Sequence, residues 1–428
     1  MRTLTLAAIT LAAFSMSGCF SDSASSGGDS GGGVTPPPSQ ATFKPLFAPL
    51  GGILPYPTDL FFNGSTDGTL NIPLLAANPT AAAMNELDGF SIIAPITVRF
   101  SDPIDPATIN QSTVKVFEVV ADPALGFATV GFKAPLLLGV DYSAQVAPNI
   151  DAGGSTLRIT PLKPLNGKSA YLVVLTNGLK STTGVAATPD SDYAAILAAL
   201  PSCDAITNTS LNGICRLVGA NVAIASNPAL GPLATAPQDI VLTFSFSTQS
   251  IADVPSVIGQ LAQARPNFVN PIPVGTTQTF IGPASPGAAN IHVGTIDMPY
   301  YVAPSEALTG RLEAAGPPPA PLDQSSRAVT RYNPVLAQKA TVTMPMIIAV
   351  PRLCGPMPEA GWPLVLYNIG LVVSRTTLIA TADALTAPPV CHAAVAIDLP
   401  LHGITDPANP LFASPQNPLY QSDTVVEP

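Results

Sequence analysis

A serine motif near the N-terminus has the spacing of a catalytic nucleophile. Residues 28–32 read Gly-Asp-Ser-Gly-Gly and satisfy Gly-x-Ser-x-Gly, a pattern that presents a serine hydroxyl on a sharp turn between a strand and a helix. Ser30, however, lies in a Gly/Ser/Pro-rich stretch with no strand before the serine and no helix after it. We therefore interpret the match as compositional and expect residues 19–42 to form a tether.

A cysteine near the N-terminus has the context of a lipid attachment site. Cys19 follows Arg2, an apolar run over residues 4–14 that is too short to span a bilayer, and the small-residue sequence Ser-Met-Ser-Gly. This order resembles the lipobox of bacterial lipoproteins, and the alternative is ordinary signal cleavage that leaves Cys19 unmodified. Because Phe20 is not the aspartate that retains such proteins at the inner membrane, the resemblance implies an outer-membrane lipoprotein of a Gram-negative cell envelope or surface, with residues 1–18 as signal peptide.

The remaining four cysteines predict two disulfides, because an even number of cysteines in an exported chain favours pairing. Cys203 and Cys215 flank a short polar loop, and Cys354 and Cys391 bracket a predicted strand and helix. We expect these two pairs. Catalysis by any of the four is not expected, since an oxidising compartment favours the bridged form over a thiolate.

One loop resembles a calcium site. Residues 63–71, NGSTDGTLN, carry oxygen side chains at alternate positions and a glycine at the sixth, but Leu74 stands where a bidentate glutamate belongs. A plain turn is the favoured interpretation. The sequence thus predicts neither a metal site nor a cofactor.

The composition favours strands and loops. The chain has 48 prolines, 47% hydrophobic residues and 10% charged residues, so it can bury large cores while proline interrupts long helices. Its formal net charge of −10, without a Lys/Arg cluster, argues against nucleic acid as a partner.

The elements fall into two groups. Period-two patterns predict short strands at 96–100, 113–120, 156–160, 171–176 and 240–246, with helices at 193–200, 217–224 and 254–264, as in an Ig-like sandwich with a helical insert. Further on, 291–302 and 341–350 are extended runs. A strand at 363–367, a helix at 375–385 and a strand at 393–397 then predict a βαβ unit of a parallel sheet.

Several phrases carry a resemblance to a known family. LPYPTDLFFNGSTDGTLNIP (54–73), GWPLVLYNIG (361–370), SRTT (374–377) and AIDLPLHG (396–403) are similar to the bacterial virulence-factor lipases, outer-membrane lipoproteins of the lysophospholipase type. The resemblance implies a mixed fold, in which a β-rich Ig-like sandwich over residues 43–289 precedes an incomplete α/β-hydrolase domain over residues 290–428.

The resemblance also implies roles for single residues. Gly370 and Leu371 match the family's oxyanion loop, although Ile369 replaces its histidine, so we treat them as an oxyanion-hole remnant. Asp398 and His402 follow the strand at 393–397. Because the triad order along the chain is Ser, acid, His, they come too early to be the triad acid and base, and we expect them to structure a loop. The other histidines, His292 and His392, are no better placed.

Two functions are open at this point. One is a surface-anchored ester hydrolase acting on lysophospholipids or other acyl esters, whose serine, acid and base lie outside this chain and which is inactive alone because the chain is shortened. The other is a non-catalytic cell-surface binding or spacer lipoprotein built on the Ig-like region. In both, the membrane is a partner through the lipid anchor, and the proline-rich tail at 406–428 is expected to be a loop.

Overall fold

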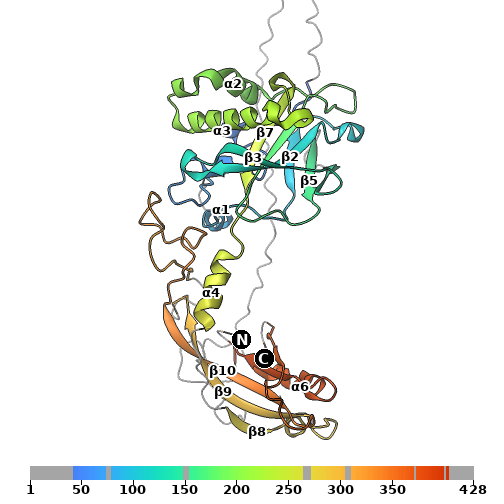
Figure 1. The fold of residues 1–428 in the computed structure, drawn as a ribbon, viewed down its shortest axis with the longest axis vertical. Helices are drawn as coiled ribbons and strands as arrows, with labels where there is room; N and C mark the ends of the chain where they lie inside the picture. Colours follow the sequence, from blue (N-terminus) through green and yellow to red (C-terminus); the bar gives the residue numbers. More distant parts are fainter. Residues whose placement is uncertain are drawn as a thin grey trace, which may run out of the picture. The chain divides into compact units, whose positions relative to one another are not determined.

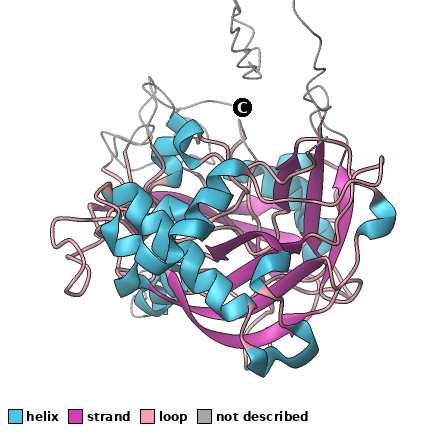
Figure 2. Cartoon of the chain, turned by 90° about the horizontal axis from the view of Figure 1, so that it is seen from above, coloured by secondary structure: helices cyan, strands magenta, loops and turns pink. Residues whose placement is uncertain are grey.

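The structure is a computed structural model, and it describes residues 42–73, 79–147, 154–263, 271–303, 310–370, 373–399 and 402–403. The serine motif at 28–32, Cys19, Leu74, Leu371 and the tail at 406–428 lie outside these ranges. Strands and loops make up most of the described chain, with helices between them (Figure 2). The β-rich character that the composition predicts is therefore confirmed.

A four-stranded antiparallel sheet forms the centre of the first region. Its order is β3-β2-β6-β7, with β2 (Val114–Asp122), β3 (Ala128–Leu136), β6 (Ala170–Thr176) and β7 (Ile240–Ser247). Every residue of β6 and β7 is buried. Both faces of these strands are therefore covered.

A three-stranded antiparallel sheet contributes to the same core. Its order is β1-β5-β4, with β1 (Ile96–Phe100), β4 (Tyr142–Ala147) and β5 (Ser155–Pro161). Inward residues of both sheets belong to one hydrophobic cluster, and the Tyr142 hydroxyl donates a hydrogen bond of 2.7 Å to the carbonyl of Val114 on β2. The arrangement is consistent with the predicted sandwich. The sequence patterns missed β4 and also β3, whose alternation is interrupted by Gly131 and Pro135.

Helices cover part of the four-stranded sheet. Helix α3 (Thr209–Ala225) contacts β3 and β7, and α2 (Ser191–Ala199) packs beside α3 (Figure 1). Their N-caps are Asp190 and Asn208, whose side chains accept hydrogen bonds from the first turns. Two more helices are α1 (Pro79–Met84) and α4 (Asp253–Gln263). Short 3₁₀ helices connect the elements: η1 (Pro49–Gly51), η2 (Asp59–Phe62), η3 (Pro106–Thr108), η4 (Pro123–Leu125), η5 (Leu200–Ala205), η6 (Pro228–Leu233) and η7 (Pro237–Asp239).

A five-stranded mixed sheet forms the C-terminal region, in the order β11-β12-β10-β9-β8. Strand β9 (Ala289–Tyr300) pairs along its whole length with β10 (Ala340–Pro351), antiparallel. Strand β12 (Ala393–Ile397) is antiparallel to β10 and parallel to β11 (Leu364–Leu366). The connection from β11 to β12 contains η9 (Arg375–Thr377) and α6 (Leu378–Thr386), so the predicted strand, helix and strand are all present.

The C-terminal sheet includes a strand that precedes the predicted boundary at residues 289 and 290. Strand β8 (Ile272–Thr276) pairs with β9, and α5 (Thr277–Ile281) follows it directly. The C-terminal sheet therefore begins at Ile272. The Pro/Gly content of this stretch concealed a strand that is short and bears a register shift between Pro273 and Gly275.

Candidate functional site

Two loops meet where β11 and β12 end. Because the two strands are parallel, their carboxyl ends lie at the same edge of the sheet, the edge at which open α/β sheets bind ligands. The loop after β11 holds Gly370, and the segment after β12 holds Asp398 and His402. The structure thus brings these three predicted site residues to one edge.

A buried ion pair fixes this edge. Asp398 accepts a hydrogen bond of 2.7 Å from the backbone N–H of Arg375 at the start of η9, and its second oxygen pairs with the Arg375 guanidinium. Both side chains are fully buried. Burial raises the pKa of Asp398, and the charges of Arg375 and His402 act in the opposite direction. Asp398 therefore ties the end of β12 to the helical crossover.

Ser374 prepares the same turn. Its hydroxyl accepts a hydrogen bond from the Thr376 N–H and lies 2.7 Å from the Thr376 hydroxyl, so it caps η9. Like Arg375, Ser374 is fully buried. Sequence reasoning noted the Ser-Arg-Thr-Thr phrase but assigned Arg375 no role. An arginine at the entrance to an otherwise apolar helix is the signal that could have identified it.

The loop after β11 is held by one side chain. Ile369 is buried and packs in the cluster beneath α6, whereas Asn368 and Gly370 are exposed. Within the described residues, the backbone N–H of Gly370 forms no hydrogen bond. The loop therefore presents a polar donor at the edge where β11 and β12 end.

The other two histidines lie apart from this edge in the sequence and the sheet. His292 is in β9, opposite Ile348 on β10 and Pro273 on β8. His392 lies next to the disulfide-bonded Cys391, and its Nδ1 lies 2.6 Å from the Val390 carbonyl oxygen.

Both predicted cysteine pairs are disulfides in the structure. Cys203 is bonded to Cys215, linking η5 to α3, and Cys354 is bonded to Cys391, linking the loop after β10 to the loop before β12. The second bond closes the segment that contains β11 and α6. It therefore restrains the loops of the candidate site.

The loop with calcium-like spacing is a turn. The carboxylate of Asp67 accepts hydrogen bonds from the Thr69 N–H and hydroxyl and from the Ser326 hydroxyl. Within the described ranges, no group of three or more His, Cys, Asp or Glu side chains could hold a metal ion. No helix in the same ranges is long and apolar enough to cross a membrane.

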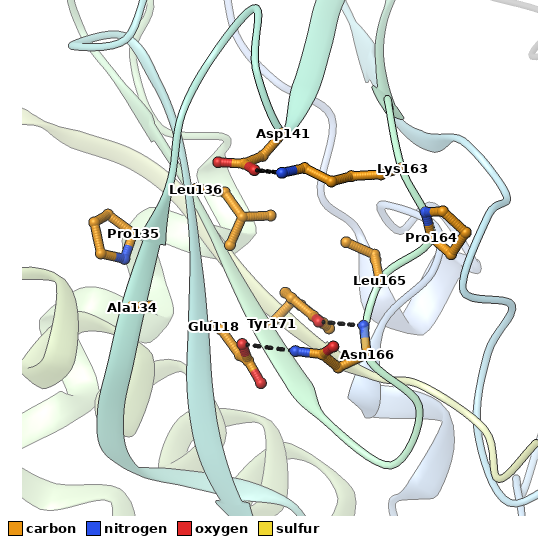
Figure 3. A pocket seen from close by; sticks show the side chains of 10 residues that line it. All are labelled: Glu118, Ala134, Pro135, Leu136, Asp141, Lys163, Pro164, Leu165, Asn166 and Tyr171. Atoms are coloured by element: carbon orange, nitrogen blue, oxygen red, sulfur yellow. Dashed lines mark hydrogen bonds and ion pairs between the residues drawn. The ribbon is translucent and has the colours of Figure 1, made fainter.

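A second candidate site is a surface pocket of about 270 Å³ in the β-rich region (Figure 3). Its walls come from β2, β3, β6 and the chain segments before β4 and after β5. Figure 3 shows Lys163 reaching toward Asp141, with 2.8 Å between Nζ and Oδ1. Lys163 lowers the pKa of Asp141.

The opposite side of this pocket is polar and includes the carboxylate of Glu118. The Asn166 side chain donates to the Glu118 carboxylate at 3.2 Å, and the Asn166 N–H donates to the Tyr171 hydroxyl at 2.9 Å. Burial raises the pKa of Tyr171 to about 12, so its hydroxyl stays protonated. Sequence reasoning missed this pocket because its residues come from separate strands.

The match to a family model covers this region. Residues 48–263 match the model described as bacterial virulence factor lipase N-terminal, which is half of the chain. The chain belongs to the bacterial virulence factor lipase family. The matched residues of this lipase N-terminal region run from η1 to α4 and contain both antiparallel sheets and the pocket of Figure 3. No curated protein sequence matches the chain.

Proposed function

We propose that this chain belongs to a surface-anchored carboxylic-ester hydrolase of the lipase and lysophospholipase type, and that residues 272–403 form the first part of an α/β-hydrolase domain. Membership of the lipase family supports the reaction class. The mixed sheet, with antiparallel strands β8 to β10 beside the parallel β11 and β12, supports the domain type. The single observation that carries the proposal is the exposed Gly370 N–H at the end of β11.

The chemistry proposed for this loop is stabilisation of an oxyanion. When a serine attacks an ester, the carbonyl oxygen gains negative charge, and backbone N–H groups in the loop after the third hydrolase strand donate to it. The Gly370 N–H is the first proposed donor to this oxygen, and the Leu371 N–H is the second. The ion pair of Arg375 and Asp398 would hold the start of η9, which follows this loop, against the end of β12 without touching the substrate.

The attacking serine is proposed to come from outside residues 42–403. Gly-x-Ser-x-Gly occurs in the printed sequence at residues 28–32, within the Gly/Ser/Pro-rich stretch, and nowhere else. In hydrolases of this fold the acid and then the histidine follow the serine along the chain. We therefore expect the 428-residue chain alone to show no ester hydrolysis and no labelling by a fluorophosphonate, which reacts with activated serines.

The direct test uses a protein that joins this chain to a segment containing Gly-x-Ser-x-Gly, and this protein should hydrolyse lysophospholipids or short acyl esters. In that protein, Gly370→Pro removes the N–H and should lower kcat by roughly 100- to 1,000-fold. Gly370→Ala is the matched control, because it keeps the N–H and its Cβ would meet Val373 at 3.8 Å, an ordinary contact.

Other results would reject this assignment. Labelling of a serine between residues 42 and 403 in the chain alone would show that the nucleophile has been misplaced. Equal activity of Gly370→Pro and Gly370→Ala would show that the loop is not an oxyanion donor.

The lipid anchor is a separate part of the proposal. We propose that Cys19 is acylated and holds the protein at the outer membrane, with the membrane as partner. Cells fed a labelled fatty acid should incorporate the label into the wild type and not into Cys19→Ser. Equal incorporation into the wild type and Cys19→Ser would show that Cys19 is not the site of acylation.

A non-catalytic binding or spacer role is the second candidate, and the pocket of Figure 3 is the observation that favours it. Its charged and neutral polar groups beside Leu136 and Leu165 suit a small polar ligand such as a sugar. A glycan array probed with the full chain and with Glu118→Gln tests this role. Absence of binding, or binding that Glu118→Gln leaves unchanged, would count against it.

A further inference from the structure

Three cationic side chains surround another pocket of the β-rich region. Lys133 on β3, Lys168 in the turn before β6 and Arg331 line a cavity of about 150 Å³. The hydroxyl-bearing residues Ser169, Ser247 and Tyr332 also line it. The chain has only 17 lysines and arginines and a net charge of −10, so this grouping departs from its general charge pattern.

The carboxylates that pair with these cations do not line the pocket. Lys133 lies 3.4 Å from Glu118, Lys168 lies 2.8 Å from Asp253, and the Nε of Arg331 lies 3.0 Å from Asp88. The two lysine side chains are 45% and 48% exposed, so water screens their ion pairs. A ligand can therefore compete with the carboxylates for hydrogen bonds from the two ammonium groups. Both ammonium groups can therefore turn toward an anion in the pocket.

Arg331 is held rigidly with one nitrogen to spare. Its Nε and Nη2 donate to the carboxylate and carbonyl of Asp88 and to the carbonyl of Thr248, while Nη1 forms no hydrogen bond to any described residue. Asp59 is a further acid whose charge interacts with that of Arg331, and burial raises its pKa to about 7. In mildly acidic solution Asp59 is therefore largely neutral and does not offset the positive charge of Arg331.

The backbone around this pocket is irregular. Phe127 and Lys168 line it with φ of 64° and 55°, and among the described residues Cys391 is the one other non-glycine residue with positive φ. The pairing of β2 with β3 also shifts register twice beside the pocket, between Glu118 and Val119 and between Val120 and Ala121. Positive φ is energetically costly at a non-glycine residue, and both features concentrate at functional sites.

We propose that this pocket binds a phosphate group. The volume is too small for a whole lipid or nucleotide but suits one tetrahedral oxyanion, and Arg and Lys with hydroxyl donors are the groups that bind phosphate. The phosphate is that of a phosphomonoester, of a phospholipid head group or of free inorganic phosphate. The site does not depend on the ester hydrolysis proposed above, because Gly370 and its loop take no part in it.

The test is calorimetric titration of the full chain, carrying Cys19→Ser so that no acyl group contributes, with inorganic phosphate and glycerol 3-phosphate at low ionic strength. The variants are Lys133→Gln and Lys168→Gly. Glycine readily adopts the φ of Lys168, so Lys168→Gly removes the charge while keeping the backbone, and its melting temperature should not fall. The matched control is Lys163→Gln, which removes a lysine from the pocket of Figure 3.

Each pocket variant should weaken phosphate binding about tenfold or more, since a hydrogen bond to a charged group contributes roughly 1.5–3 kcal/mol. Lys163→Gln should bind like the parent. Flotation with phosphatidylglycerol vesicles distinguishes the sources of the phosphate. Vesicle binding by the parent that is lost in the double variant Lys133→Gln/Lys168→Gly identifies a lipid head group. Phosphate binding without vesicle binding identifies a free phosphate. Absence of binding to both probes, or equal affinity in the parent and the double variant, would overturn the proposal.

Discussion

The central sheets of the two regions differ in how their faces are covered. In the four-stranded sheet of the lipase N-terminal region, every residue of β6 and β7 is buried. In the C-terminal sheet, β12 alternates between buried and half-buried residues, and Leu364 and Leu366 of β11 are 60% and 72% exposed. Similar apolar runs thus produce two fully buried strands in one region and, within the described residues, a sheet covered chiefly on its α6 face in the other.

The two regions also differ in the partners that they provide for a buried carboxyl group. Asp398 in the C-terminal region has the Arg375 guanidinium as partner. Asp59 in the N-terminal region is fully buried, and neither of its carboxyl oxygens hydrogen-bonds to a described residue. Burial therefore raises the pKa of Asp59 to about 7, although Ser245, Ser247 and Arg331 lower it in part. The charge of Asp398 is offset by a counter-ion, whereas ionisation of Asp59 lacks a hydrogen-bonded counter-ion among the described residues and is therefore unfavourable.

The largest effect is expected from Asp398→Asn. The substitution leaves the Arg375 charge fully buried without its counter-ion and should lower the free energy of unfolding by about 3–5 kcal/mol. Urea unfolding followed by the fluorescence of Trp362, the single tryptophan and a neighbour of β11, measures it. Asp204→Asn is the control, because Asp204 pairs with Arg216 in solvent and should produce no measurable change. If Asp398→Asn and Asp204→Asn lowered the free energy of unfolding equally, the buried ion pair would contribute no more to stability than the exposed one.

The disulfides allow each region to be loosened in turn. Cys354→Ser/Cys391→Ser opens a loop with a sequence separation of 37, and Cys203→Ser/Cys215→Ser opens one of 12. Loop entropy predicts losses of about 4 and about 3 kcal/mol respectively. Trp362 fluorescence should report the first loss and far-UV circular dichroism the second. A larger loss from the shorter loop would contradict the entropic explanation.

Asp59 predicts a pH dependence of the N-terminal region. Its pKa is higher in the folded than in the unfolded chain, so its contribution is fully present below about pH 4 and is lost as the pH rises through about 7. Between pH 5 and pH 8 the wild type should lose about 2–3 kcal/mol more than Asp59→Asn, whose side chain does not ionise. Urea unfolding at both pH values measures this difference, and parallel profiles would show that Asp59 is not the titrating group.

The smallest effect concerns the covered edge of β7. The Tyr193 hydroxyl accepts a hydrogen bond of 2.9 Å from the Thr243 N–H and lies 2.8 Å from the Thr243 hydroxyl, so α2 satisfies a buried backbone donor on an edge strand. Tyr193→Phe should cost about 1–2 kcal/mol in thermal or urea unfolding. Tyr56→Phe, at an exposed ring, is the matched control and should have no measurable effect.

Sequence patterns predicted the elements that have a clear apolar pattern. They missed elements whose formation depends on pairing with a neighbouring strand. The strand at 393–397, a continuous apolar run, and the helix at 375–385, with apolar residues at helical spacing, are both present. β8 was missed, since a five-residue strand with proline and glycine is stabilised by its neighbour β9 rather than by its own propensity. The loop-structuring role of Asp398 was predicted, but its partner Arg375 was not, because the two residues are 23 positions apart.

The sequence by itself determined the β-rich character, the family and the pairing of cysteines, because composition, short motifs and even cysteine number are local properties of the chain. Only the tertiary structure decided that Thr243 and Ser245, on the polar side of β7, are buried beneath helices and hydrogen-bonded there. It alone brought Lys133, Lys168 and Arg331 to one pocket. Burial and charge proximity depend on contacts between distant segments, and no local pattern records which segments meet.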